Sequence, residues 1–410
     1  MSIEKLPNDI IHYLGLYLPL SDLLNLSLTC KKINQVLCKD QVFWKLRFLY
    51  DFGKEPSTLK QLYIDELAGG NILIFGKNDC GQLGLGDRIN RLAPIQIPNL
   101  KANLIFGGEN HTAIIYQKNN VLVCGWNRDG QLGLGDTVDR LIPTKIRNLK
   151  AKQVSYGSQH IAIIDQDSNV LVCGRNRDGL GDTVDRLTPK QIPNLKAKQV
   201  ACGYDHTAII DQDRNVLMFG QNMYGQLGLG DTVDRRTPKQ IRNLKAKQVA
   251  CGYDHTAIID SDNNVYTFGG NKYGQLGLGD TVDRLIPTKI PNLKATLVAC
   301  GAYHTAVIDQ DGNVLMFGRN MYGQLGLGDS KARLLPEKIP NITTKFISCG
   351  SFHNTIIDQN GNILTFGNNS YGQLGLDDTV DRLTPEQIPN LQVKTKFIVS
   401  CGNYHTIIII

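Results

Sequence analysis

Hydrophobic and polar positions in residues 69–410 repeat with a period near 49 residues. Each unit places two short apolar, β-branched runs on either side of a turn rich in Asp and Asn, as in residues 202–220, and this pattern predicts a β-hairpin. A glycine-rich heptapeptide and a run containing proline follow, so one unit supplies about four short strands. The heptapeptide GQLGLGD, or a variant of it, begins at Gly81, Gly130, Gly179, Gly225, Gly274, Gly323 and Gly372.

Seven such units match the blade number and blade size of a β-propeller, with a solenoid as the competing architecture. The array opens within a unit, at the strand 71–76, and stops within a unit, at residues 405–410. Because the half that is missing at one end is present at the other, the two ends can complete one composite blade. We therefore expect residues 69–410 to form a closed seven-bladed propeller. The unit at Gly179 lacks three residues, and we expect this deletion to shorten one turn without opening the ring.

Residues 5–50 follow a different pattern, with apolar side chains at helical spacing. Pro7 suits a first helical turn, and Asp40 suits an N-cap. We expect a small all-α domain over residues 1–53 and a linker over 54–68. The predicted fold class is therefore an all-β seven-bladed propeller preceded by a small helical domain.

Composition and charge narrow the class of protein. The chain has 41% hydrophobic and 20% charged residues, which is typical of a globular protein, and its net charge of +6 is too diffuse to indicate nucleic acid binding. No apolar run approaches the roughly 20 residues of a membrane span, and the first residues lack the apolar segment of a secretory signal. Five of the ten cysteines share one slot of the repeat, which favours a reducing compartment over disulfides. We expect a cytoplasmic or nuclear protein without a membrane partner.

The search for catalytic and metal-binding patterns points to structural roles. A Cys-x3-His pair recurs along the array, and repetition in so many units favours packing for the cysteine and a hydrogen bond to the backbone for the histidine over a metal site. The turn 309–313 begins like a calcium loop but lacks the Gly and Glu of that motif, and the heptapeptide lacks the Lys of a P-loop. Each unit also holds an Asp and, four residues later, an Arg, as in Asp136 and Arg140, which we interpret as an ion pair that fixes a loop. We expect no enzyme activity, no metal and no cofactor.

Positions that differ between units are candidates for binding. The slots after the third strand of two neighbouring units hold one aromatic and several basic side chains, which would form a patch for an acidic partner on one rim of the propeller. The alternative is a solvated rim with one chance tryptophan. The loop before the histidine, with Tyr303, Phe352 and Tyr404, is a second candidate. The rim candidates are Trp126, Arg128, Arg175 and Arg177.

The repeats resemble those of the regulator of chromosome condensation family. The resemblance rests on GQLGLGD, on the CG-xx-HT element and on the FG-x-N strand end, and it covers residues 69–410. It implies a seven-bladed propeller. Members of the family include a nucleotide exchange factor for a small nuclear GTPase that also binds chromatin, a plant ultraviolet photoreceptor and substrate-side modules of ubiquitin ligases, so the resemblance implies the fold more firmly than the function.

The N-terminal segment is similar to an F-box, through LPxDII, LPLSDLLNLSLTCKK and a closing FW. The resemblance implies docking on a Skp-type adaptor and, through it, on a cullin. Ile33 stands where that family usually carries an aromatic residue. The residues that match the motif, and that would bind the adaptor, are Leu6, Pro7, Asp9, Leu14, Leu18, Leu23, Leu28, Cys30 and Trp44.

Together these resemblances imply a non-catalytic subunit of a cullin-based, SCF-type ubiquitin ligase, whose propeller binds an unknown substrate protein. The alternative is a guanine-nucleotide exchange factor or chromatin-binding propeller for a Ran-like GTPase. Units of nearly constant length disfavour exchange, because the family's exchange factor inserts a wedge in one blade. Light sensing is disfavoured because Trp126 is the one tryptophan of the repeats.

Overall fold

The structure is a computed structural model, and it describes residues 69–175, 182, 184–392 and 398–410. The chain divides after Gly70 into two units, of which the second, Asn71–Ile410, holds nearly all the described residues. The predicted helical domain, the linker and all nine candidate adaptor-binding residues lie outside the described residues. Among the described residues, no helix is long and apolar enough to cross a membrane.

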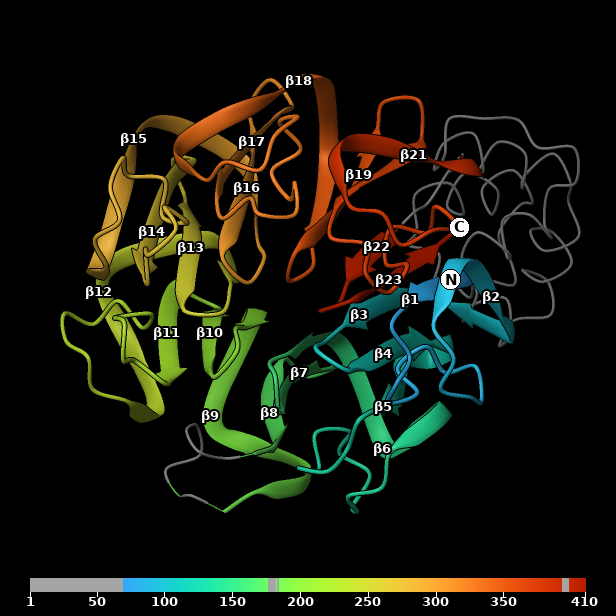
Figure 1. Cartoon of the computed structure of the whole chain (residues 1–410). Helices are drawn as coiled ribbons and strands as arrows, with labels where there is room; N and C mark the ends of the chain where they lie inside the picture. The colour runs from blue at the N-terminus through green and yellow to red at the C-terminus, as the bar shows by residue number, and fades with distance from the viewer. Residues whose placement is uncertain (1–68, 176–181, 183, 393–397) are drawn as a thin grey trace, which may run out of the picture. The chain divides into compact units, whose positions relative to one another are not determined.

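The described residues form seven antiparallel sheets around a central axis (Figure 1). A 3-10 helix, η3 (Gln117–Asn119), joins two of the strands. The strands are β1 (Gly70–Gly76), β2 (Arg91–Ala102), β3 (Leu104–Gly107), β4 (His111–Tyr116), β5 (Asn120–Gly125), β6 (Arg140–Tyr156), β7 (His160–Asp165), β8 (Asn169–Gly174), β9 (Arg186–Cys202), β10 (His206–Asp211), β11 (Asn215–Gly220), β12 (Arg235–Cys251), β13 (His255–Asp260), β14 (Asn264–Gly269), β15 (Arg284–Cys300), β16 (His304–Asp309), β17 (Asn313–Gly318), β18 (Arg333–Cys349), β19 (His353–Asp358), β20 (Asn362–Gly367), β21 (Arg382–Gln392), β22 (Ile398–Cys401) and β23 (His405–Ile409).

Five long strands each belong to two sheets. In β12, Arg235 pairs with Gly220 at the outer edge of one sheet, whereas Cys251 pairs with Thr256 at the inner edge of the next. The bend between the two halves contains Asn243, whose φ of 55° lies in the left-handed region that asparagine tolerates better than most residues. Asn148, Asn194, Asn292 and Asn341 bend the other four long strands in the same way.

One sheet takes strands from both ends of the repeat array. Its order is β2-β1-β23-β22, and β1 runs antiparallel to β23 from the pair Ile72 and Ile409 to the pair Gly76 and His405. Backbone bonds join this sheet to the next one around the axis, where Asn403 donates to the Gly108 carbonyl over 2.9 Å. The seven-bladed propeller predicted from the sequence is confirmed, and the ends of the array meet within one blade.

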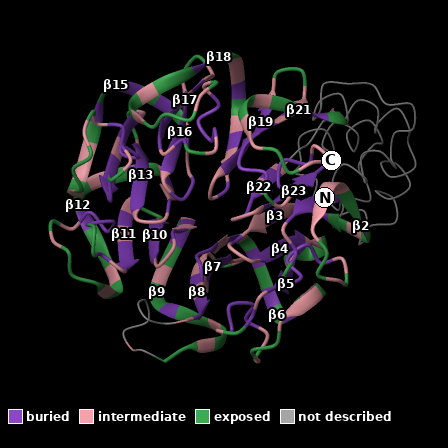
Figure 2. Ribbon diagram, in the orientation of Figure 1, coloured by how far each residue is buried: buried purple, intermediate pink, exposed green. Residues whose placement is uncertain are grey.

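The hydrophobic core lies between neighbouring sheets, while the outer strand halves carry most of the exposed residues (Figure 2). One cluster combines Met218 and Leu227 with Ile258 and Phe268 of the following sheet. Gly228, in the heptapeptide, has a φ of 65°, and a Cβ there would lie 2.7 Å from the Phe268 ring. The heptapeptide therefore inserts its leucine into the core and needs glycine where its backbone crosses the ring.

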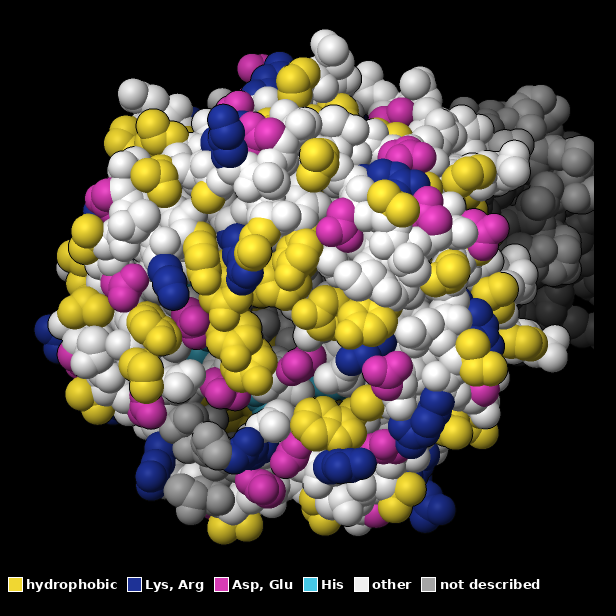
Figure 3. Space-filling model, in the orientation of Figure 1, with side chains coloured by type: hydrophobic (Ala, Val, Ile, Leu, Met, Phe, Trp, Pro, Cys, Tyr) yellow, Lys and Arg dark blue, Asp and Glu magenta, His cyan; other side chains and the backbone are white. Residues whose placement is uncertain are grey.

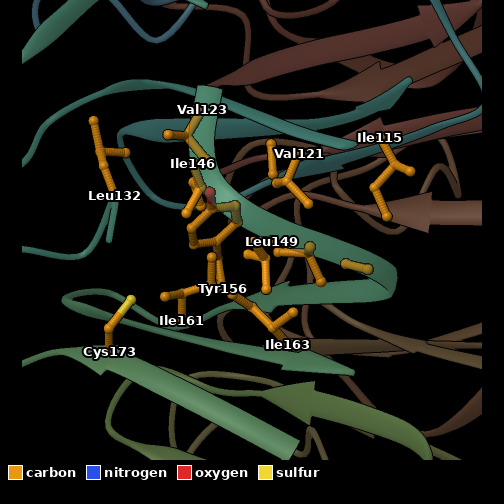
Figure 4. Close-up of a cluster of buried hydrophobic side chains, with 13 residues drawn as sticks. Ile115, Val121, Val123, Leu132, Ile146, Leu149, Tyr156, Ile161, Ile163 and Cys173 are labelled. Carbon is orange, nitrogen blue, oxygen red and sulfur yellow. The ribbon is translucent and has the colours of Figure 1, made fainter. Parts of the chain in front are cut away.

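The core around the second repeat is packed differently (Figure 4). Cys173 stands at the slot that holds Phe219 in the following repeat, and Tyr156 stands at the slot that holds Cys202. The Tyr156 ring lies among the side chains of Ile146, Leu149 and Ile161. The large and the small residue have exchanged places, which keeps the core volume filled.

The three-residue deletion leaves the strands on either side of it paired. Gly174 of β8 faces Arg186 of β9, in the same register as Gly220 and Arg235 one repeat later. The connection between the paired residues is therefore three residues shorter, as predicted, and the sheet is not interrupted.

Candidate binding face

Six histidines link neighbouring repeats around the axis. His206 Nε2 lies 3.0 Å from the Thr256 hydroxyl of the following repeat, and that hydroxyl donates to the Gln226 carbonyl over 2.9 Å. The equivalent Thr305 donates to the Gln275 carbonyl in the same way. Because the hydroxyl proton is used on the carbonyl, the histidine Nε2 carries a proton and donates it. The six His partners are Thr207 for His160, Thr256 for His206, Thr305 for His255, Asn354 for His304, Thr406 for His353 and Thr112 for His405.

One link of this series is missing. Ile161 occupies the slot of the acceptor threonine, and neither ring nitrogen of His111 has a hydrogen-bond partner among the described residues. The His111 ring instead contacts the edge of Tyr156, with ring centroids 4.1 Å apart. The expectation that the histidines bind backbone atoms was therefore wrong: their Nε2 partners are side chains of the next repeat.

The recurring cysteines line the axial cavity as free thiols, of which Cys202 and Cys401 are buried and the other three are partly exposed. Cys202 Sγ lies 3.4 Å from the Ser155 carbonyl of the preceding repeat, and Cys401 Sγ lies 3.4 Å from that of Ser348. Burial raises the pKa of the Cys202 thiol to about 11 and lowers the pKa of the His206 imidazole to about 3. Both groups are therefore neutral at pH 7, and the histidine Nε2 is committed to the next repeat. This arrangement packs repeats together and lacks the activated thiolate of a nucleophile.

The Asp and Arg of each unit form the expected ion pair. Arg235 Nη2 lies 2.5 Å from the Asp231 carboxylate, which also accepts the Val233 N–H over 3.0 Å. The bonds from the Val233 backbone and the Arg235 side chain hold the pKa of Asp231 below its usual value. The loop-fixing role is confirmed in all seven units, with the pairs Asp87–Arg91, Asp136–Arg140, Asp182–Arg186, Asp231–Arg235, Asp280–Arg284, Asp329–Arg333 and Asp378–Arg382.

An axial cavity of about 520 Å³ opens among the loops that precede the histidines. Five aromatic side chains follow one another along its border, and we call them the aromatic arc. Ring centroids are 3.8, 5.2, 6.3 and 6.2 Å apart in order. Figure 3 shows a central hollow bordered by hydrophobic and acidic side chains. The arc consists of Tyr204, Tyr253, Tyr303, Phe352 and Tyr404.

A second set of tyrosines, each just before a heptapeptide, supports the arc from outside. Tyr273, Tyr322 and Tyr371 meet the arc rings edge to face, with centroids 5.2 to 5.5 Å apart. Such edge-to-face pairs hold rings in fixed orientations. The arc is therefore a preorganised surface.

Charged groups lie beside these rings. The Arg319 guanidinium lies over Tyr273 at 5.0 Å and over Phe352 at 5.4 Å, and Lys77 lies over Tyr371 at 5.1 Å. Burial raises the pKa of Glu109 to about 7 and that of Asp254 to about 6. This face therefore combines aromatic rings with the cationic side chains of Arg319 and Lys77 and with the poorly solvated carboxylates of Glu109 and Asp254.

The rim candidates from the sequence are only partly placed. Trp126 is half-buried after β5, Arg128 is exposed, and Arg175 is half-buried after β8, where its guanidinium contacts the Gln159 side chain. Among the described residues no hydrogen bond or cation–π contact joins Trp126 to Arg128 or Arg175, and Arg177 lies outside them. A joint basic patch stays a prediction.

Sequence reasoning found three of the five arc residues and missed the rest of the face. Tyr204 and Tyr253 stand two residues before their histidines, whereas Tyr303, Phe352 and Tyr404 stand one residue before, so a single slot does not show the arc. One signal was available. A tyrosine directly precedes the heptapeptide in four successive repeats, at Tyr224, Tyr273, Tyr322 and Tyr371.

The fold and its sevenfold repetition define a repeat protein of the β-propeller class. The chain belongs to the family of the regulator of chromosome condensation (RCC1) repeat, whose model matches seven consecutive stretches, and it carries an F-box-like domain at residues 3–50. The stretches are residues 69–115, 118–164, 167–210, 214–259, 262–308, 311–357 and 360–409.

Solved structures share this fold. A chain of the complex of Kap60 with yeast RCC1 (Prp20) is 23% identical, with a TM-score of 0.75 over 83% of this chain and 88% of that one. Prp20p from Saccharomyces cerevisiae, whose structure is described with its binding to Gsp1p and histones, is 23% identical, with a TM-score of 0.75 over 83% and 91%. Human WBSCR16 is 22% identical, with a TM-score of 0.74 over 83% and 98%. A comparison with curated protein sequences found no match.

Proposed function

We propose that the protein is the substrate-recognition subunit of a cullin-based ubiquitin ligase. The observation that carries the proposal is the union in one chain of an F-box-like domain, at residues 3–50, with seven RCC1 repeats. The F-box would dock on a Skp-type adaptor and thereby on a cullin. The propeller would hold the substrate protein, in the cytoplasm or the nucleus.

In this role the chain positions the substrate protein and catalyses no step itself. Binding a substrate beside the ubiquitin-charged enzyme raises the effective concentration of its lysines, which is the whole contribution that a recognition subunit makes. The linking histidines His206, His255, His304, His353 and His405 fit this role, because they are buried and their Nε2 atoms are used between repeats. The aromatic arc offers the kind of surface from which binding hot spots are built.

The proposal is tested with the double variant Leu6→Ala and Pro7→Ala in the full-length protein. We expect this variant to lose binding to a purified Skp-type adaptor, and through it to the cullin, because the substitutions truncate two apolar side chains of the F-box motif. The matched control is Trp126→Ala, which changes the propeller rim and leaves the F-box untouched. If the double variant bound the adaptor with wild-type affinity, the assignment of the F-box as the adaptor-binding domain would be wrong.

The alternative is nucleotide exchange or chromatin binding for a Ran-like GTPase. Its support is the similarity to Prp20p, whose binding to Gsp1p and histones is part of that protein's description. Its assay is the release of labelled guanine nucleotide from a purified Ran-like GTPase. Acceleration by both the wild-type protein and the double F-box variant would favour this alternative over the ligase.

A further inference from the structure

The slot after the third strand of each repeat decides whether the neighbouring rings receive a cation from the protein itself. At Arg319 this slot holds a guanidinium that lies 5.0 Å from the centre of the Tyr273 ring, 5.7 Å from Tyr303 and 5.4 Å from Phe352. One repeat earlier the slot holds Gly270, which has no side chain. The backbone is held alike in the two repeats, since Gly270 N–H donates to the Asp254 carbonyl over 2.7 Å and Arg319 N–H donates to the Tyr303 carbonyl over 2.9 Å.

The residues around Gly270 are the equivalents, one repeat earlier, of the residues around Arg319. Tyr224 corresponds to Tyr273, Asp254 to Tyr303, and Tyr303 to Phe352. A Cβ at Gly270 would lie 3.2 Å from Asp254 Cβ and 3.6 Å from Tyr224 Cβ, so these residues border the space above the glycine. We call the site formed by Tyr224, Asp254, Gly270 and Tyr303 the Gly270 recess. It repeats the Arg319 site with a carboxylate in place of one ring and without the arginine.

The recess has the charge that a cation needs. No hydrogen bond or ion pair of the Asp254 carboxylate is found among the described residues, and the acidic residues Asp205 and Asp283 add to the negative potential around it. Two basic side chains lie nearby: Lys272 lies 5.6 Å from the centre of the Tyr273 ring in the same repeat, and Arg319 lies 5.7 Å from the centre of the Tyr303 ring. Tyr224 is 40% exposed and therefore accessible, whereas the Tyr303 ring is held in place by Tyr253, which stacks on it at 5.2 Å.

We propose that the Gly270 recess binds an arginine side chain of a partner protein, which takes the place that Arg319 fills in the next repeat. The planar guanidinium suits this site better than an ammonium does, because it stacks on rings and presents paired donors to a carboxylate. The inference deepens the proposed function by naming the chemistry that the propeller would recognise in a substrate. It does not depend on the F-box.

The test begins with displayed twelve-residue peptides selected on the full-length wild-type protein. We expect the selected peptides to share an arginine, and replacement of that arginine by citrulline, which keeps the shape and removes the charge, to weaken binding about tenfold or more. We expect Asp254→Asn to weaken binding of the arginine peptide by a similar factor and to leave binding of the citrulline peptide unchanged. Asn110 and Gln159 occupy the same slot in other repeats, so the fold accepts an amide there.

Gly270→Arg is the second variant, because it supplies the guanidinium from the protein itself. Other repeats carry Arg or Gln in this slot, and the Cβ contact of 3.2 Å needs a shift of only a few tenths of an ångström. We expect this variant to lose peptide binding. Its control is Val282→Arg, which adds the same charge at a position that is 61% exposed and outside the recess, and which should bind within about twofold of wild type.

Peptides without a shared arginine, or arginine peptides that bind equally to wild type, Asp254→Asn and Gly270→Arg, would overturn the proposal. A wild-type dimer that Gly270→Arg dissociates in sedimentation would assign the recess to a second copy of this chain, and would also overturn it. The Leu6→Ala, Pro7→Ala variant should keep peptide binding. Failure of adaptor docking and failure of arginine binding are therefore separate outcomes.

Discussion

Thr256→Val tests the histidine links between repeats. Valine has nearly the shape of threonine, so the change removes the hydroxyl without opening a cavity. The hydroxyl is fully buried, lies 3.0 Å from His206 Nε2 and donates to the Gln226 carbonyl over 2.9 Å. The substitution leaves one buried donor and one buried acceptor without partners. At about 1–3 kcal/mol for each orphaned group, with partial relaxation, we expect the free energy of unfolding to fall by about 2–4 kcal/mol.

The matched variant is Thr256→Ser, which keeps both hydrogen bonds and loses one methyl group, for about 1 kcal/mol. Ile161→Val provides a second control, because its slot carries no hydroxyl and the change should cost about 0.5–1.5 kcal/mol. Urea unfolding followed by circular dichroism gives the three free energies. Hydrogen exchange at β12 and β13 shows whether the loss is local to that pair of blades. If Thr256→Val unfolds no more easily than Thr256→Ser, the reasoning about the links is wrong.

Two further predictions concern acid and the heptapeptide. Burial lowers the pKa of five histidines to about 3, namely His111, His206, His255, His353 and His405. As the pH falls below about 6.5, the histidines of the unfolded chain therefore take up protons before those of the folded chain. The stability that is present above that pH should be lost progressively toward pH 4. Burial also lowers the pKa of His160 and His304, to about 4. Glu109 and Asp254 act in the opposite sense, since their pKa values are raised, but they are two groups against seven. An unfolding free energy that stays constant from pH 7 to 5 in urea titrations would contradict the argument. Gly228→Ala should destabilise by at least about 2 kcal/mol, because it combines a positive φ with a Cβ 2.7 Å from Phe268, and a loss below about 1 kcal/mol in the same assay would mean that the ring can move aside.

The sequence predicts what depends on neighbours within one repeat. The hairpins follow from alternation around an Asp-Asn turn, and the Asp231–Arg235 pair follows from its recurrence four residues apart. The partner of His206 could not be found this way, because Thr256 is 50 residues distant and meets it only through the register between two blades. Only part of the aromatic arc was predicted, for a related reason, since its rings leave the backbone from two different slots and converge only in space.

The strands shared between sheets bear on how such an array can grow. A 49-residue segment cut from this chain carries part of one blade and part of the next, because β12 begins in one sheet and ends in the following one. Any window of that length is therefore an equivalent unit of duplication, wherever its borders fall. Identical stretches at 194–211 and 243–260 are consistent with such copying. The ring is closed by the pairing of β1 with β23. A gained or lost unit therefore changes the circumference of the ring and leaves this strand pairing unchanged.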